Sequence, residues 1–352
     1  MSQDLIAKAL EEEGFDENKF QENLLRERSE RLPPVTDEMW ENVLKEHKDL
    51  VDEFLEVNTH LSDHSKKQYR SALRIWFYFV YDSLNNKHIS KITKRDFLRF
   101  MSFLDSRKMS SSGKSFKKSA VSSLNNYIEA VVAEDDVKYE KFRSFTKGLP
   151  PIPRNQTYKK VLVTKEEYKE MMDALESDEN YLGMAWLATA FNVGARRAEI
   201  IQFKTELLDY EFDEKKGFVV SNELRGKGRS SEGKIIDFMI NKEALKYMKL
   251  WVDKRGYRHE YIFTVDGRDE EPRQMGLDWA DIFCKNVLSN IVGRRINPHI
   301  FKASAITHLL QDGVDITLVS RYIAHHENVS TTAIYDLREF EEEKSKIFGN
   351  GE

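Results

Sequence analysis

The sequence predicts two domains: an all-α domain, and after it a mixed α+β domain that is mainly helical with a small sheet or hairpin. The 352 residues exceed the roughly 100 to 200 residues of a typical domain. Pro150, Pro151 and Pro153 cluster near the middle, and prolines so close together are typical of an extended linker. We therefore predict an acidic helical extension (1–45), a helical domain (46–149), a basic proline-rich linker (150–160) and a second domain with a C-terminal tail (161–352).

Apolar side chains recur at helical spacing throughout the first domain. Ser62 precedes the strongest of these stretches and is a candidate N-cap, because its hydroxyl can accept a hydrogen bond from a free amide of the first turn. The predicted helices span residues 36–55, 61–81, 92–104 and 119–133, and a serine-rich basic loop (107–118) precedes the last one.

The second domain has a mixed pattern. Residues 216–222 and 234–240 are rich in β-branched and aromatic residues and flank a glycine-rich basic turn, so they predict a hairpin. Thr164 is a candidate N-cap for the first helix. The predicted helices span residues 163–175, 183–191, 242–252, 274–287, 301–311, 316–323 and 330–337.

Composition excludes several classes of protein. The longest apolar run, Ile75 to Tyr81, is far shorter than the roughly 20 residues of a membrane span, and no signal peptide is visible, so we expect a cytoplasmic protein. The single cysteine, Cys284, excludes an internal disulfide framework and a cysteine-based zinc site. No carboxylate cluster resembles a two-metal nuclease site. We expect no metal and no cofactor.

Charge is distributed unevenly along the chain. Residues 1–50 hold seven basic and fourteen acidic side chains, whereas residues 60–120 hold fourteen basic and four acidic ones. The basic segment and the linker favour double-stranded DNA as the partner. A solvated helix face or a plain hinge would have a similar composition. The candidate DNA-binding residues are Lys66, Lys67, Arg70, Arg74, Lys114, Lys117, Lys118, Arg154, Lys159 and Lys160.

Four short segments of the second domain carry the residue types needed for phosphate chemistry. They are VGARRAEI (193–200), RGKGRSSEGK (225–234), NPHIFKASAITHLL (297–310) and AHHENVSTTAIYDL (324–337). Cations and imidazoles can stabilise a phosphate that gains charge, and a phenol can attack it. Each segment alone is a weak signal, and each residue has an ordinary structural alternative. Their order and spacing together make the signal strong.

These segments resemble those of the tyrosine recombinase (phage integrase) family. The resemblance implies a helical core-binding domain before the linker and a catalytic domain after it. It also implies a role for each matched residue: Arg196 clamps the phosphate, Lys227 is the acid, His299 accepts a proton, His326 donates a hydrogen bond and Tyr335 is the nucleophile. Arg197 and His308 are more typical of an ion-pair residue and a core or capping histidine.

Three positions depart from the family pattern. Lys302 stands where the family has its second arginine and is the candidate for the second catalytic cation at the phosphate, although an ammonium cannot form the two parallel hydrogen bonds of a guanidinium. Ala324 and His325 replace the usual leucine and glycine before His326. Two functions therefore remain open: a site-specific recombinase or integrase that forms a 3′-phosphotyrosyl intermediate, and a catalytically inactive DNA-binding protein, such as a phage-type repressor or architectural factor. A type IB topoisomerase-like enzyme would share the chemistry.

We also predict roles for the two ends of the chain. The acidic residues 1–50 either cover the basic face, contact a second protomer or form a solvated arm. The resemblance implies that the C-terminal tail, with Phe340, Ile347 and Phe348, docks on a neighbouring subunit, so we expect dimers or tetramers on DNA. The protein would then be associated with the nucleoid of a bacterial or phage-infected host.

Overall fold

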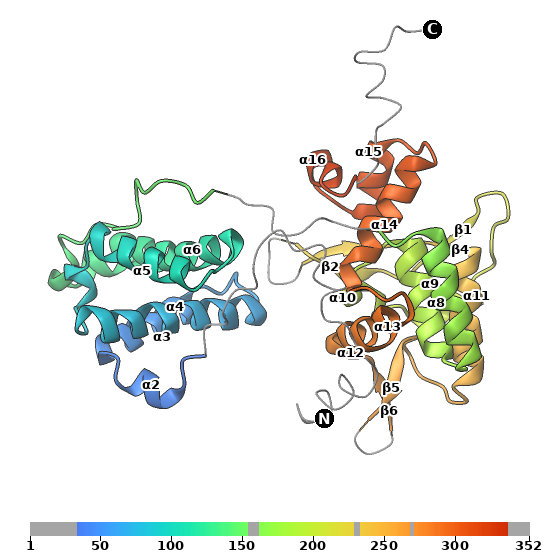
Figure 1. Ribbon diagram of the computed structural model, residues 1–352, viewed down its shortest axis with the longest axis horizontal. Helices are drawn as coiled ribbons and strands as arrows, with labels where there is room; N and C mark the ends of the chain where they lie inside the picture. The colour runs from blue at the N-terminus through green and yellow to red at the C-terminus, as the bar shows by residue number, and fades with distance from the viewer. Residues whose placement is uncertain (1–33, 154–161, 229–232, 268–270, 337–352) are drawn as a thin grey trace, which may run out of the picture. The chain divides into compact units, whose positions relative to one another are not determined.

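The computed structural model describes residues 34–153, 162–228, 233–267 and 271–336, which form two compact units. The first is all-helical, and the second combines helices with three short two-stranded sheets (Figure 1). None of the described helices is long and apolar enough to cross a membrane. The predicted helix within residues 1–33, the linker residues Arg154, Lys159 and Lys160, and the C-terminal tail lie outside the described residues.

The helical unit packs around the indole of Trp76, which is fully buried on α4. Phe97 and Phe100 of α5 place their rings against this indole, with centroids 5.5 and 5.0 Å away. Trp40 and Val43, from the predicted extension, pack in the same core. The elements are α2 (Asp37–Glu41), α3 (Lys45–Val57), α4 (Asp63–Leu84), η1 (Ile89–Lys91), α5 (Lys94–Ser106), α6 (Ser111–Tyr127), η2 (Ile128–Val132), α7 (Ala133–Asp135) and η3 (Val137–Tyr139).

Two predictions for the helical unit were wrong in detail, although the Ser62 N-cap is confirmed. The predicted helix 36–55 is broken into α2 and α3, because Asn86 accepts from the Leu44 amide and donates to the Asn42 carbonyl. The predicted loop 107–118 is mostly helix. Ser110 caps α6 by accepting a hydrogen bond from the Gly113 amide at 3.0 Å, so the helix begins eight residues earlier than expected.

The second unit is built around α9, a helix with ten buried residues that packs against α8, α11 and α14. Its helices up to α14 are α8 (Lys165–Ser177), α9 (Tyr181–Val193), α10 (Arg197–Ile200), η4 (Thr205–Asp209), α11 (Lys242–Lys254), α12 (Leu277–Phe283), η5 (Cys284–Leu288), α13 (Ser289–Ile291) and α14 (Pro298–Gln311). Beyond α14 follow α15 (Ile316–Val319), η6 (Ser320–Ala324) and α16 (Val329–Ala333).

The predicted hairpin forms as two short antiparallel pairs. Strand β1 (Phe218–Val220) pairs with β4 (Met239–Asn241), and β2 (Leu224–Gly226) pairs with β3 (Lys234–Ile236). A third pair, β5 (Thr264–Asp266) with β6 (Pro272–Gln274), was not predicted. The helix predicted from Gln274 therefore begins at Leu277, and the last predicted helix ends at Ala333.

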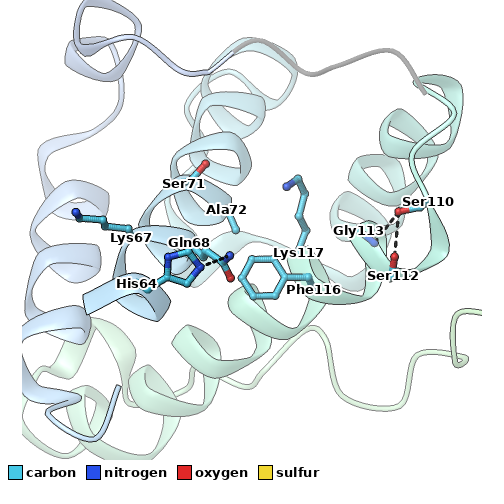
Figure 2. Close-up of a pocket in the computed structure, with 10 residues that line it drawn as sticks. All are labelled: His64, Lys67, Gln68, Ser71, Ala72, Ser110, Ser112, Gly113, Phe116 and Lys117. Carbon is cyan, nitrogen blue, oxygen red and sulfur yellow. Dashed lines mark hydrogen bonds between the residues drawn. The ribbon is translucent and has the colours of Figure 1, made fainter. Parts of the chain in front are cut away.

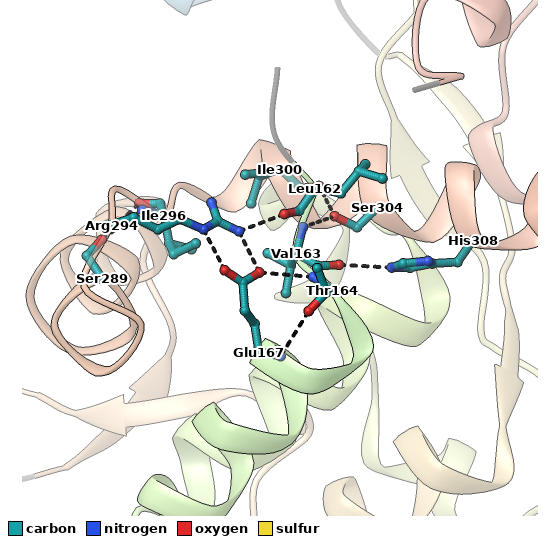
Figure 3. Close-up of polar contacts among 10 residues, drawn as sticks. All are labelled: Leu162, Val163, Thr164, Glu167, Ser289, Arg294, Ile296, Ile300, Ser304 and His308. Atoms are coloured by element: carbon teal, nitrogen blue, oxygen red, sulfur yellow. Dashed lines mark hydrogen bonds and ion pairs between the residues drawn. The ribbon is translucent and has the colours of Figure 1, made fainter. Parts of the chain in front are cut away.

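A network of hydrogen bonds connects residues 162–167, at the start of the second unit, to Arg294 and to α14 (Figure 3). The Arg294 guanidinium donates two hydrogen bonds of 2.6 Å to the Glu167 carboxylate and one to the Leu162 carbonyl. Ser304 accepts from the Val163 amide, and a ring nitrogen of His308 lies 2.9 Å from the Val163 carbonyl. His308 therefore links α14 to the segment that precedes α8. Its helix, α14, also carries two of the predicted catalytic residues.

Candidate active site

Tyr335 and His299 form the centre of the candidate active site. The Tyr335 hydroxyl lies 3.0 Å from His299 Nε2, and the two ring centroids are 5.5 Å apart. His299 is in the first turn of α14, whereas Tyr335 follows α16. Thr307, two turns further along α14, donates a 2.6 Å hydrogen bond to the Tyr335 carbonyl. The same helix therefore fixes both the backbone and the hydroxyl of the tyrosine.

His326 also contacts the Tyr335 ring: the two rings are stacked, with their centroids 5.3 Å apart. Its Nδ1 is 2.9 Å from the Thr332 hydroxyl, which is fully buried on α16. Burial, followed by the charges of Lys302 and Arg196, lowers the pKa of His326 to about 4. The imidazole is therefore neutral near pH 7 and can donate one hydrogen bond without carrying charge.

Arg196 lies directly before the short helix α10, beside a buried carboxylate. Its guanidinium donates to Glu199 Oε1 at 2.7 Å, and its backbone amide donates to Glu199 Oε2 at 2.6 Å. Burial alone would raise the pKa of Glu199, but Lys302 and Arg196 together hold that pKa below its ordinary value. Glu199 thus fixes the direction of the Arg196 side chain.

Lys302 occupies a different environment from that of a surface cation. Its side chain is 0% exposed, and Nζ donates to the Gly194 carbonyl at 2.9 Å. The Ile323 carbonyl lies 3.4 Å from the same nitrogen. Burial, followed by the charge of Arg196, lowers the pKa of Lys302 to about 7, against the opposing effect of Glu199.

The remaining predicted catalytic residue, Lys227, is exposed directly after β2. Among the described residues, the contacts around Tyr335 and α14 bring the other five together but do not include Lys227. Sequence reasoning missed Lys234, at the start of β3. Its ammonium donates to the His325 carbonyl, and its charge acts on both Lys302 and His326. A lysine where the second strand begins was the available signal.

The structure also shows the environment of Ala324 and His325, which differ from the family pattern before His326. His325 adopts the left-handed conformation, with φ 51°, which explains why glycine suits this position. Its ring packs edge-on against Phe238 at 4.6 Å, and Ala324 is fully buried. Arg197 forms an ion pair with Asp281, as its alternative interpretation predicted.

Comparisons with known proteins identify the family of the chain. Residues 162–342 match the model of the phage integrase family. The chain is 60% identical to the SPbeta prophage-derived recombinase-like protein YomM of Bacillus subtilis strain 168, over 94% of this chain and 98% of that protein. It is 24% identical to tyrosine recombinase XerC of Staphylococcus carnosus, over 80% and 88% of the two chains.

A solved structure supports the same fold. The lambda integrase dimer bound to a COC′ core site aligns with a TM-score of 0.60 at 13% identity, covering 88% of this chain and 83% of that one. The predicted fold class, a helical domain followed by a mainly helical α+β catalytic domain, is confirmed. The chain belongs to the phage integrase family, that is, to the tyrosine recombinases.

Proposed function

We propose that this protein is a site-specific DNA recombinase that cleaves and rejoins double-stranded DNA through a 3′-phosphotyrosyl intermediate. The 3.0 Å separation between the Tyr335 hydroxyl and His299 Nε2 carries the proposal, because it pairs a nucleophile with a proton acceptor. The 60% identity to a protein named recombinase-like supports it further.

The proposed reaction exchanges one phosphodiester for another. The Tyr335 oxygen attacks the phosphorus while its proton passes to His299. The bond from phosphorus to the 5′ oxygen breaks, and Lys227 protonates that oxygen as it leaves. Arg196 balances the charge of the non-bridging oxygens, and neutral His326 donates to one of them. Attack by a 5′ hydroxyl on the phosphotyrosine reverses these steps and rejoins the DNA.

A second candidate function is a DNA-binding protein that has lost the chemistry. The observation that favours it is the enclosed ammonium of Lys302, which donates to backbone carbonyls at the family's second-arginine position. In that case the fold binds DNA, as a repressor or an architectural factor would, and Tyr335 does not react.

We propose that the helical unit holds the DNA backbone at a hollow of about 640 Å³ between the starts of α4 and α6 (Figure 2). Lys67 of α4 and Lys117 of α6 are among its lining residues, together with three serines. Serine hydroxyls and lysines are common phosphate ligands. Lys66 lies beside Lys67 on α4.

Four other candidate DNA-binding residues already have partners within the unit. Arg70 pairs with Asp52, Arg74 with Asp37, and Lys114 with Asp105. Lys118 donates to the Pro150 carbonyl at 3.1 Å. Lys67 and Lys117 are therefore the stronger candidates for phosphate contact.

We also propose that the protein assembles as dimers or tetramers on DNA through its C-terminal tail. The exposed apolar side chains of Leu318, Tyr322 and Ile334 near the end of the described chain offer a surface for such a contact. Light scattering on a two-arm site should then give a mass of two protomers or more. Independent monomers on both arms would contradict this.

The deciding experiment is to trap the covalent complex. A suicide substrate, nicked near the cleavage site, should give a denaturation-resistant protein–DNA adduct with the wild type and none with Tyr335→Phe. Tyr210→Phe is the matched control, because Tyr210 is 42% exposed and lies outside the proposed site. The cognate site comes from selecting bound genomic fragments. Specific binding without an adduct would favour the non-catalytic candidate.

A further inference from the structure

Lys302 lies where two loops of the candidate active site meet. Gly194, whose carbonyl accepts from Nζ at 2.9 Å, ends α9 two residues before Arg196. Ile323, whose carbonyl is 3.4 Å away, lies in η6 three residues before His326. The ammonium thus joins the segment that carries the arginine to the segment that carries the histidine.

The surroundings of Lys302 leave it little access to a ligand. The residue is 0% exposed, like the aromatic residues of the core. A methyl group on Gly194 would lie 3.0 Å from the Ala305 Cβ and 3.4 Å from the Ile323 Cγ2, so the two loops are already in contact beside it. A DNA phosphate would have to displace one of these backbone segments to reach Nζ.

We propose that Lys302 is a positioning residue, which holds the loops of Arg196 and His326 together and does not contact the DNA phosphate. The inference rests on the proposed function, since DNA phosphate is the ligand that these loops would bind. It assigns Lys302 a different task from the arginine usual at this position. A neutral amine can still donate to two carbonyls, whereas a phosphate clamp needs the charge.

Hydrogen exchange in the free protein tests the positioning role. Lys302→Met keeps the volume and removes the donors, whereas Lys302→Gln keeps two N–H donors without charge. The reporters are the Arg196 amide, bound to Glu199, and the His326 amide, bound to the Ser320 carbonyl. We expect these amides to exchange about tenfold faster in the methionine variant, with partial rescue by glutamine.

Amides of α11 are the control for global destabilisation. They should exchange at the wild-type rate if the change is local to the two loops. Equal acceleration in α11 would reveal a merely structural role, and unchanged rates at Arg196 and His326 would also overturn the proposal.

The salt dependence of DNA binding tests whether Lys302 touches a phosphate. Near pH 6, where the ammonium is charged, each lost phosphate contact should lower the slope of log K against log salt by about 0.9 on duplex DNA. Arg196→Met should show this loss. The double variant with Lys302→Met should show no further loss, because a positioning residue acts through Arg196.

The outcomes distinguish the positioning role of Lys302 from the proposal that this site binds a DNA phosphate. A loss of about 1.8 in the double variant would mean two independent phosphate contacts, and would overturn the positioning role of Lys302. A slope unchanged by Arg196→Met would contradict phosphate binding at this site. The exchange result would then still decide whether Lys302 holds the loops.

Discussion

The burial of Lys302 makes the stability of the catalytic unit depend on pH. Its pKa falls from the ordinary 10.5 to about 7 in the folded protein. Between these values the unfolded chain binds more protons than the folded chain, so the contribution of Lys302 to the free energy of unfolding rises with pH. That contribution is complete above about 10.5 and is lost as the pH falls through 7. The charged or titratable neighbours are Arg196, Glu199, Lys234, His325 and His326.

We expect the free energy of unfolding of the wild type, relative to Lys302→Met, to increase by a few kcal/mol between about pH 7 and pH 10. Urea unfolding at several pH values measures this difference. Lys249→Met is the control, since Lys249 is an exposed lysine of α11 and its loss should leave the pH profile unchanged. A difference that stays constant over this range would contradict the expectation.

The chemical types at the candidate site could be predicted from the sequence, but the environment of Lys302 could not. The motif order identifies Arg196, His299, His326 and Tyr335, and the structure brings these four to one site. The direction of the Lys302 side chain depends on two carbonyls that are 108 and 21 residues away in the chain. Such a tertiary contact leaves no local pattern.

At the level of elements, the ends of helices carry most of the errors of prediction. The N-caps Ser62 and Thr164 were predictable, because a hydroxyl before an apolar-periodic stretch is a local signal. The break between α2 and α3 was not, since the amide that supports it belongs to Asn86, at the end of α4. The early start of α6 had a local signal in Ser110, which the high serine content obscured.

The end of α9 gives a prediction at this scale. Gly194 has φ 67°, and an added Cβ would lie 3.0 Å from the Ala305 Cβ. We expect Gly194→Ala to lower the free energy of unfolding by about 2 to 4 kcal/mol, because left-handed strain and overpacking add. Gly256→Ala is the matched control: its φ is 74° and nothing lies within 4 Å of the added Cβ.

Gly256→Ala should therefore cost only the strain, about 1 kcal/mol. Urea unfolding of both variants gives the comparison. If both variants lose the same free energy of unfolding, the close approach to Ala305 does not affect stability.

For the whole molecule, the main features are the two larger hydrophobic cores of the described residues and an uneven distribution of charge. One core gathers residues from Val43 to Phe145 and the other from Val163 to Phe301, in agreement with the two-domain fold class that the proline cluster indicated. The balance of fourteen basic to four acidic residues over 60–120 was evident from the sequence. Which of these cations are already paired required the structure.

The hollow between α4 and α6 gives the prediction at this scale. Replacing Lys67 and Lys117 by glutamine should weaken binding to duplex DNA and lower the salt slope by about 1.8, or 0.9 for each phosphate contact. Lys45→Gln is the control, since its 84% exposed side chain pairs with Asp49 on α3. Fluorescence anisotropy at several salt concentrations measures the slope. An unchanged slope would exclude phosphate contact at the hollow.

The hydrogen bond from Thr307 to the Tyr335 carbonyl has a consequence for assemblies of this protein. Together with the contact to His299, it ties the tyrosine to α14 of its own chain, the helix that also carries Lys302. Under the proposed function, each protomer attacks with its own nucleophile. Genetic complementation between a protomer that lacks Tyr335 and one that lacks Arg196 would then fail, because neither chain lends its tyrosine to the other.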